Sequence, residues 1–197
     1  MKDNICKYLN TLKNTIDLLD IEEIAAFIKV LTQLYDKGGN IYLIGNGGSA
    51  STASHFACDL NKGVSFTLDK KFKVISLADN IPTMLAYAND VDFSDIFVEQ
   101  LKNHLTEKDM VIGISGSGNS KNILKAIEYA NRLGSITVGI TGYDGGELKK
   151  TADYIINANI DNMQITEDIH MILTHLTTTV LSEELKARET TAIGLSQ

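Results

Sequence analysis

The stretch that decides the fold runs from Met110 to Asn122 and reads MVIGISGSGNSKN. It opens with an apolar run of the kind that forms a buried parallel strand. Three serines, Ser115, Ser117 and Ser120, then alternate with glycines before a helical pattern of apolar residues begins. A strand that passes through a small-residue turn into a helix predicts one β–α unit of an open parallel sheet.

The same alternation repeats along the chain, where the period of the apolar residues switches between that of a strand and that of a helix. Short apolar runs predict strands at residues 40–44, 73–77, 110–114, 135–140 and 154–157. Helical spacing predicts helices at residues 49–60, 81–87, 95–105, 119–133 and 164–187. We therefore expect an α/β fold with a mostly parallel sheet and helices on both faces, in a single domain that spans residues 1–197.

Two further helices are predicted before the first strand, within residues 3–37. Apolar residues recur there every three or four positions, and Gly38 and Gly39 end the second helix. Such a helical segment can cover one edge of the sheet or can bundle with copies from other subunits. The pattern alone leaves both possibilities open.

Composition excludes several classes of protein. Apolar residues make up 44% of the chain and charged residues 22%, which is typical of a globular domain and argues against disorder. The net charge of -7, without a dense run of Lys or Arg, predicts no nucleic-acid partner. With no signal peptide or apolar span we expect no membrane association and a soluble, cytoplasmic protein. Cys6 and Cys58 predict no disulfide framework, and Cys58 is expected to be a small buried residue.

Two predicted strands end in glycine- and serine-rich loops, GNGGS at residues 45–49 and SGSGNS at residues 115–120. Ligands bind at the carboxyl ends of parallel strands, where a helix N-terminus offers unpaired N–H groups to an anion. Neither loop has the spacing of a nucleotide-binding motif. The simpler alternative is that the serines only cap helices, with Ser49 or Ser51 available for the first of them. Two such loops in one sheet favour phosphate binding.

A carboxylate and a histidine fall on each of two predicted helices. His55 and Asp59 are four residues apart and share a face. Glu167 and His175 are eight residues apart, which is about 12 Å of helical rise, so both can approach one ligand between them. His170, three residues after Glu167, competes for the same role. The set predicts a metal site or general acid–base chemistry.

Several motifs together resemble the sugar isomerase (SIS) domain family: GNGGSASTASHF, GISGSGNSKNILKAIEYA, TGYDGGEL and EDIHMILTH. Within that family the chain is most similar to phosphoheptose isomerases, which interconvert sedoheptulose 7-phosphate and a heptose 7-phosphate through an enediol. The resemblance implies a five-stranded parallel sheet flanked by helices, in a flavodoxin-like three-layer arrangement. It also implies a homotetramer with sites shared between subunits, which would give residues 1–37 a part in oligomerisation.

The resemblance assigns roles position by position. It implies that the sugar phosphate contacts Asn46, Gly47, Ser49, Asp90, Ser115, Gly116, Ser117, Ser120 and Glu167. It implies that zinc is held by His55, Asp59, Glu167 and His175. It further implies that Asp59 and His175 transfer protons.

Three positions depart from the isomerase pattern. Asp59 stands where these enzymes usually have Glu, Glu167 where they have Gln, and Gly116 where they have Thr. A carboxylate shortened by one methylene moves by roughly 1 Å, a shift that can cost a proton-transfer step about a hundredfold in rate. The alternative function is that of a non-catalytic SIS protein, which either senses a phosphosugar or binds a protein partner as the DnaA initiator-associating protein does.

Overall fold

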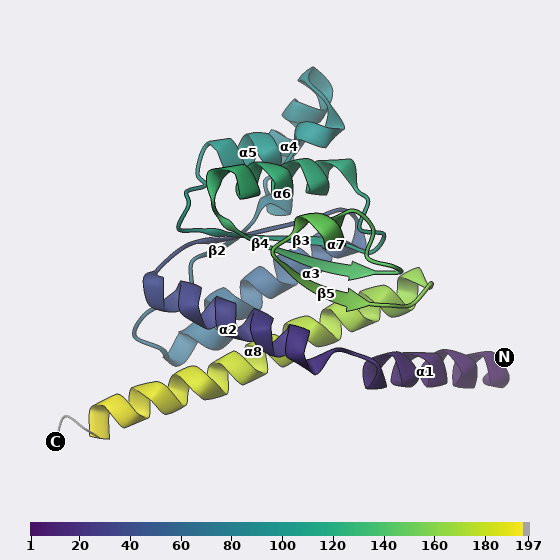
Figure 1. Ribbon diagram of the computed structural model, residues 1–197, viewed down its shortest axis with the longest axis horizontal. Coiled ribbons are helices and arrows are strands. Elements are labelled where there is room, and N and C mark those ends of the chain that lie inside the picture. Colours follow the sequence, from purple (N-terminus) through teal and green to yellow (C-terminus); the bar gives the residue numbers. More distant parts are fainter. Residues whose placement is uncertain (195–197) are drawn as a thin grey trace.

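Five parallel strands form one sheet at the centre of the protein, in the order β2-β1-β3-β4-β5 (Figure 1). The computed structural model describes residues 1–194. The strands are β1 (Ile41–Gly45), β2 (Val74–Ser76), β3 (Met110–Ser115), β4 (Ile136–Gly142) and β5 (Tyr154–Ala158). Every residue of β1 and β3 is buried, as expected for strands covered on both faces. The predicted parallel five-stranded sheet is confirmed.

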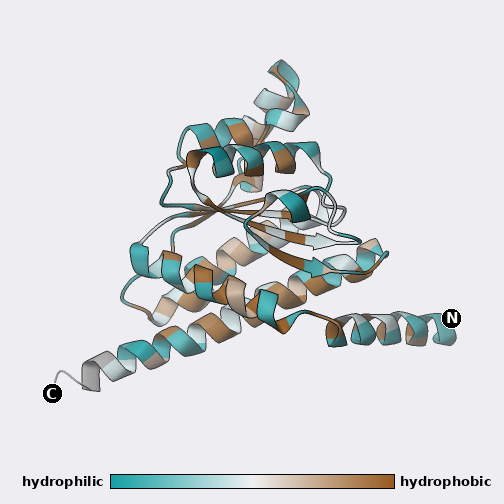
Figure 2. Ribbon diagram, in the orientation of Figure 1, coloured by the Kyte–Doolittle hydropathy of each residue, from teal (hydrophilic) through white to brown (hydrophobic). Residues whose placement is uncertain are grey.

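Helices cover both faces of this sheet, which gives three layers (Figure 1). The helices are α1 (Lys2–Asp17), α2 (Ile21–Lys37), α3 (Gly48–Cys58), α4 (Ile81–Asp90), α5 (Val98–Lys102), α6 (Lys121–Leu133), α7 (Leu148–Thr151) and α8 (Met163–Gly194). Apolar residues of α2, α3 and α8 form one core with the sheet, and residues of α5, α6 and α7 form the other. Figure 2 shows the consequence, with hydrophobic colour on the strands and on the inner sides of these helices.

The strand order places a switch point between β1 and β3. The chain leaves β1 toward β2 on one side and β3 toward β4 on the other, so the two following loops diverge at neighbouring strand ends. Gly45, the last residue of β1, pairs with Ile114 of β3. In open sheets of this kind the crevice at the switch point is where ligands bind. Both glycine- and serine-rich loops therefore begin side by side at that crevice.

Some element boundaries differ from the predicted ones. The helix predicted at 95–105 is a short 3-10 turn, Phe93–Asp95, followed by α5. The helix predicted at 49–60 ends at Cys58 and continues as a π-helix, Asp59–Val64. Helix α7 was not predicted, because a single turn is too short to show a helical period. These differences leave the order of strands and helices unchanged.

Two predictions about α3 are wrong. Cys58 is exposed, because the buried face of α3 carries the apolar residues that precede it and the thiol points away from that face. Neither Ser49 nor Ser51 caps the helix, since a turn at Gly47 (φ 54°) starts α3 at Gly48 and places both serines inside it. Ser49 is instead buried in the first turn.

The N-terminal helices differ in how they are attached. The Asp20 side chain caps α2 by accepting hydrogen bonds from the N–H groups of Glu22 and Glu23. Helix α1 lies outside the layers and contacts α8, where the Tyr8 hydroxyl donates to Asp168 at 2.6 Å (Figure 1). Through residue 194, none of the helices combines the length and the apolar character needed to cross a bilayer.

Candidate functional site

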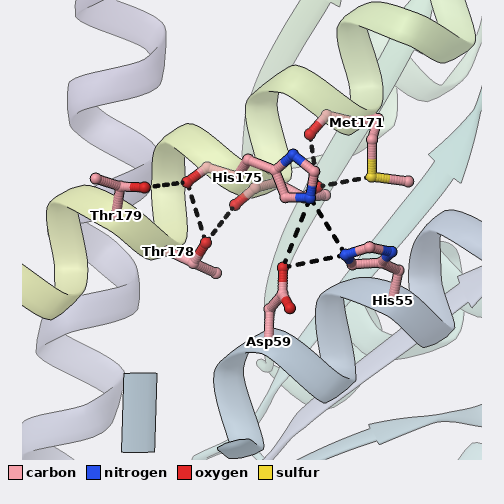
Figure 3. A network of polar contacts seen from close by, with 7 residues as sticks. His55, Asp59, Met171, His175, Thr178 and Thr179 are labelled. Carbon is pink, nitrogen blue, oxygen red and sulfur yellow. Dashed lines mark hydrogen bonds and ion pairs between the residues drawn. The ribbon is translucent and has the colours of Figure 1, made fainter. Parts of the chain in front are cut away.

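Three side chains from two helices meet at one point on the protein surface (Figure 3). His55 lies near the end of α3, Asp59 begins the π-helix that follows, and His175 lies on α8. The Nε2 atoms of the two histidines are 3.2 Å apart, and Asp59 Oδ2 is 3.4 Å from His55 Nε2 and 4.0 Å from His175 Nε2. We call these residues the His–Asp cluster. The sequence predicted that all three share a site, and the structure brings them together.

Glu167 lies apart from the His–Asp cluster, although it was expected in the same metal site. A Cβ atom placed on Gly48 would lie 2.5 Å from Glu167 Oε1, so this carboxylate covers the first turn of α3. Helices α3 and α8 pack side by side in the same direction, so Glu167 meets the start of α3 while His175 meets His55 two turns later. Glu167 therefore faces the loop after β1.

The His–Asp cluster has the geometry of a site for a zinc ion. Zinc in enzymes takes nitrogen and carboxylate ligands at about 2.0–2.2 Å in a tetrahedral arrangement, with three protein ligands and one open position. Ligands at that distance in a tetrahedron lie about 3.3–3.6 Å from one another. The separations of 3.2 and 3.4 Å from His55 Nε2 are close to this, and the 4.0 Å between Asp59 Oδ2 and His175 Nε2 is somewhat longer. His55, Asp59 and His175 fit the metal, and Glu167 is not needed for it.

His170 does not belong to the cluster. It points from α8 into the core, is 1% exposed, and neither ring nitrogen has a hydrogen-bond partner of good geometry within the described chain. Burial lowers the pKa of His170 to about 4, and the nearby backbone of Thr141 only partly opposes this. The side chain is therefore a neutral core residue at physiological pH.

The serine loop, residues 115–120, leads from β3 into α6. The Ser115 hydroxyl donates to Ser120 Oγ at 3.2 Å, and Ser117 Oγ accepts the N–H of Asn119 at 3.2 Å. Ser120 occupies the N-cap of α6, but no capping hydrogen bond from its side chain is present in the described structure. The alternative in which these serines only cap the helix is therefore not favoured, and the first turn of α6 keeps donors for a ligand.

The TGYDGG turn, residues 141–146, supports the serine loop from behind. The Leu148 N–H donates to the Gly118 carbonyl at 2.9 Å. The Asn119 amide donates to the Ser117 carbonyl at 2.9 Å and accepts from the Glu147 N–H at 3.1 Å. A Cβ atom on Gly146 would lie 2.5 Å from the Ser117 carbonyl, so the two backbones touch directly. This contact explains why glycines are needed in both segments.

Gly118→Ala should lower the free energy of unfolding by about 2–4 kcal/mol. Gly118 has φ of +65°, and a Cβ atom there would overlap the Gly145 carbonyl. The matched control is Gly134→Ala, which has φ of +85° with Glu107 Cβ at 3.8 Å as the neighbour of its Cβ. The control should lose only about 1 kcal/mol. Urea unfolding measures both, and equal losses would show that the backbone contact is unimportant.

A cavity of about 340 Å³ opens between the two strand-end loops. It is lined by Asn46, Asp92, Phe93, Ser94, Ser120, Lys121 and Asn122. Sequence reasoning found Asn46 and Ser120 there but missed Lys121, which places a positive charge directly beside the serine loop. The hydrogen bonds from Ser94 lower the pKa of Asp92, which also lines the cavity.

Asp90 does not line this cavity. It ends α4, a helix with no buried residue among those described, and accepts a hydrogen bond from Asn89 at 2.7 Å. Its expected role beside the substrate therefore has no support within one chain. Residues 92–94, which follow it, lie against the loops instead.

Comparisons with known proteins agree with this arrangement. Residues 6–142 match the family model described as the SIS domain. A probable phosphoheptose isomerase of Thermoplasma acidophilum is 34% identical over 166 residues, covering 84% of this chain and 91% of that protein. A phosphoheptose isomerase of Helicobacter pylori is 34% identical over 182 residues, covering 89% and 93%. The structure of a phosphoheptose isomerase from Francisella tularensis superposes with a TM-score of 0.84 at 28% identity, covering 92% of this chain and 97% of that one.

Proposed function

Since the chain belongs to the SIS domain family and is an isomerase of sugar phosphates, we propose that it converts sedoheptulose 7-phosphate to D-glycero-D-manno-heptose 7-phosphate. One observation carries this proposal. The His–Asp cluster, which offers a carboxylate and two imidazoles, lies on the two helices that also flank the strand-end loops. Proton-transfer groups and an anion site thus share one edge of the sheet.

The substrate phosphate binds at the serine loop in this proposal. Ser115, Ser117 and Ser120 supply hydroxyls, the first turn of α6 supplies N–H groups, and Lys121 supplies a positive charge. The sugar then extends along α3, past Asn46, Gly47, Ser49 and Glu167, toward the His–Asp cluster. His55 lies nine positions after Asn46, with most of the intervening residues in α3, which is about 13 Å of helical rise. An extended seven-carbon chain with its phosphate is of comparable length.

The reaction moves one proton between two carbons. Asp59 takes a proton from C1 of the ketose, which leaves an enediol, and returns it to C2. His175 moves the accompanying proton between the hydroxyl on C1 and the carbonyl oxygen on C2. The Asp59 carboxylate lies within 4.0 Å of both imidazoles, so the two proton transfers can be coordinated. His55 orients Asp59 for this purpose.

We expect the His–Asp cluster to hold zinc in the working enzyme. His55, Asp59 and His175 fit it, as the separations of their ligand atoms indicate, and the Asp59 oxygen and His175 nitrogen that do not face the ion would be the atoms that transfer protons. A bound zinc ion would supply Lewis-acid stabilisation of the negative charge that develops on the substrate oxygens. The extra carboxylate of Glu167, where the isomerases usually have Gln, would then face the sugar hydroxyls at the start of α3.

We also propose that copies of the chain associate through the N-terminal segment, residues 1–37, as a homotetramer. Helix α1 exposes Met1 at 96%, Ile5 at 54% and Leu9 at 57%, and these apolar side chains form a continuous face. Figure 2 shows hydrophobic residues along α1 although it lies away from the sheet. Large exposed apolar faces usually mark an interface.

The test is a panel of phosphorylated ketoses with five, six and seven carbons, assayed in heavy water. We expect deuterium to enter at C1 of sedoheptulose 7-phosphate and at C2 of the aldose product, with slower exchange for the shorter sugars. Unphosphorylated sedoheptulose should react much more slowly because the serine loop loses its ligand. Metal analysis of the same preparation tests for zinc. Binding of the phosphoketose without any deuterium uptake would refute the isomerase proposal and favour a sensor.

A further inference from the structure

Two asparagine side chains join the strand-end loops across the crevice. The Asn46 amide donates to Asn122 Oδ1 at 2.9 Å, and the Asn122 amide donates back to Asn46 Oδ1 at 2.8 Å. Asn46 follows β1, and Asn122 lies in the first turn of α6 just after the serine loop. This reciprocal pair links the residue after β1 directly to the first turn of α6.

Asn122 is held in one orientation by the backbone. It is 2% exposed, and its Oδ1 also accepts the N–H of Ile123 at 3.0 Å. A backbone N–H can only donate, so the oxygen of Asn122 and not its nitrogen must face Ile123. The same N–H also donates to the Ser120 carbonyl at 3.0 Å, so rotating the amide would not leave this N–H without a partner. It would place the Asn122 NH2 group against the Ile123 N–H, two donors facing each other in a buried place, which is unfavourable.

The fixed orientation of the Asn122 amide also fixes the orientation of the Asn46 amide. Because the oxygen of Asn122 accepts from Asn46, the nitrogen of Asn46 must face it, and the oxygen of Asn46 must face the Asn122 amide. A side-chain amide has two N–H donors and an oxygen with two acceptor positions. The pair uses one donor and one acceptor position of half-buried Asn46. One donor and one acceptor position stay available in the cavity that both asparagines line.

We propose that Asn122 is a positioning residue for sugar binding, which acts through Asn46. It sets the spacing of the two loops. It also determines where the NH2 group of Asn46 lies, which donates to the sugar hydroxyls, and where its oxygen lies, which accepts from them. This inference rests on the proposed function, because it assumes that Asn46 contacts the sugar. Asn122 itself contacts the protein and need not touch the substrate.

A double-mutant cycle tests this directly. Asn122→Asp keeps the shape of the side chain but replaces the donor to Asn46 Oδ1 with an acceptor, so kcat/KM should fall about tenfold to a hundredfold, mainly through KM. Asn46→Ala should give a loss of similar size. If Asn122 acts through Asn46, the double variant should be no worse than the worse single variant. Losses that multiply would overturn the proposal.

The matched control is Asn131→Asp, on the same helix. The Asn131 amide also makes two hydrogen bonds, as donor to the Thr151 carbonyl at 2.7 Å and as acceptor from the Thr137 hydroxyl at 2.7 Å. It lies nine residues beyond Asn122, about 14 Å along α6 and far from both loops. This variant should lose stability without a change in KM. A rise in KM equal to that of Asn122→Asp would mean that general damage to α6 explains both.

A second measurement needs no substrate. The side-chain amide signal of Asn46 in a nitrogen–proton correlation spectrum should shift, and its protons should exchange faster with water, in Asn122→Asp and in Asn122→Ala. An Asn46 signal that both variants leave unchanged would refute the positioning role. A wild-type protein that exchanges no proton on any phosphoketose would refute the proposed function instead, so the two failures are distinguishable.

Discussion

Asp59→Asn is expected to lower the turnover of the phosphoketose by about a hundred- to ten-thousandfold, the range typical of losing a general base. The amide is isosteric with the carboxylate, but it cannot take a proton from carbon. It also replaces the anion that lies within 4.0 Å of both His55 and His175. Turnover is measured by the appearance of the aldose and, independently, by deuterium uptake at C1 of the ketose and C2 of the aldose.

Glu183→Gln is the matched control for this substitution. Glu183 is an exposed carboxylate in the same surface groove as Asp59, on the opposite wall formed by α8, and no bond joins it to the His–Asp cluster. The control should retain activity within about twofold, since surface charges contribute little. His175→Gln should resemble Asp59→Asn. Near-normal rates in both cluster variants would remove the proton-transfer assignment.

Asp59→Glu separates the effect of the negative charge at this position from the effect of where the carboxylate lies. The longer side chain restores the residue that the isomerases usually have, but it moves the carboxylate by roughly 1 Å relative to a cluster arranged around Asp. We expect this variant to retain far more activity than Asp59→Asn. If Asp59→Glu lost as much activity as Asp59→Asn, the position of the carboxylate, rather than its charge, would limit the reaction.

The sheet could be predicted from sequence because its signals are local. Strands buried on both faces form unbroken apolar runs. A left-handed glycine ends the helix that comes before two of them, Gly38 (φ 76°) before β1 and Gly134 (φ 85°) before β4. The number of strands and the three-layer arrangement followed from the resemblance to a family, and no strand order was predicted. Boundaries such as the π-helix after Cys58 could not be predicted, because a helix that widens keeps nearly the same apolar period.

The site could be predicted only in part. The four-residue spacing of His55 and Asp59 fixed their common face, and the structure confirms that they meet His175. The position of Glu167 depended on how α3 and α8 pack, since helical rise and rotation allowed it to approach either the cluster or the start of α3. The Asn46–Asn122 pair spans 76 positions of the sequence, and neither residue carries a signal of its partner.

His170→Leu is expected to remove a large pH dependence of stability. The pKa of His170 is about 4 in the folded protein because of burial, against 6.5 in the unfolded chain. Below pH 6.5 the unfolded chain binds a proton that the folded protein does not, so the folded state loses stability as the pH falls. The loss continues until the pH reaches about 4 and amounts to about 3 kcal/mol.

The measurement is urea unfolding at fixed protein concentration, at intervals between pH 7 and pH 4. Leu has a similar volume and no nitrogen atoms that need partners, so the variant should be at least as stable as the wild type at pH 7. The stability gap should then widen by about 3 kcal/mol toward pH 4. His104→Leu, at an exposed position, is the control and should follow the wild-type curve. The His–Asp cluster is intact in the wild type and in both variants, so its contribution to the pH dependence cancels in the comparison. A stability gap between His170→Leu and the wild type that stays constant with pH would show that the pKa of His170 is the same in the folded and unfolded states, so that burial does not lower it.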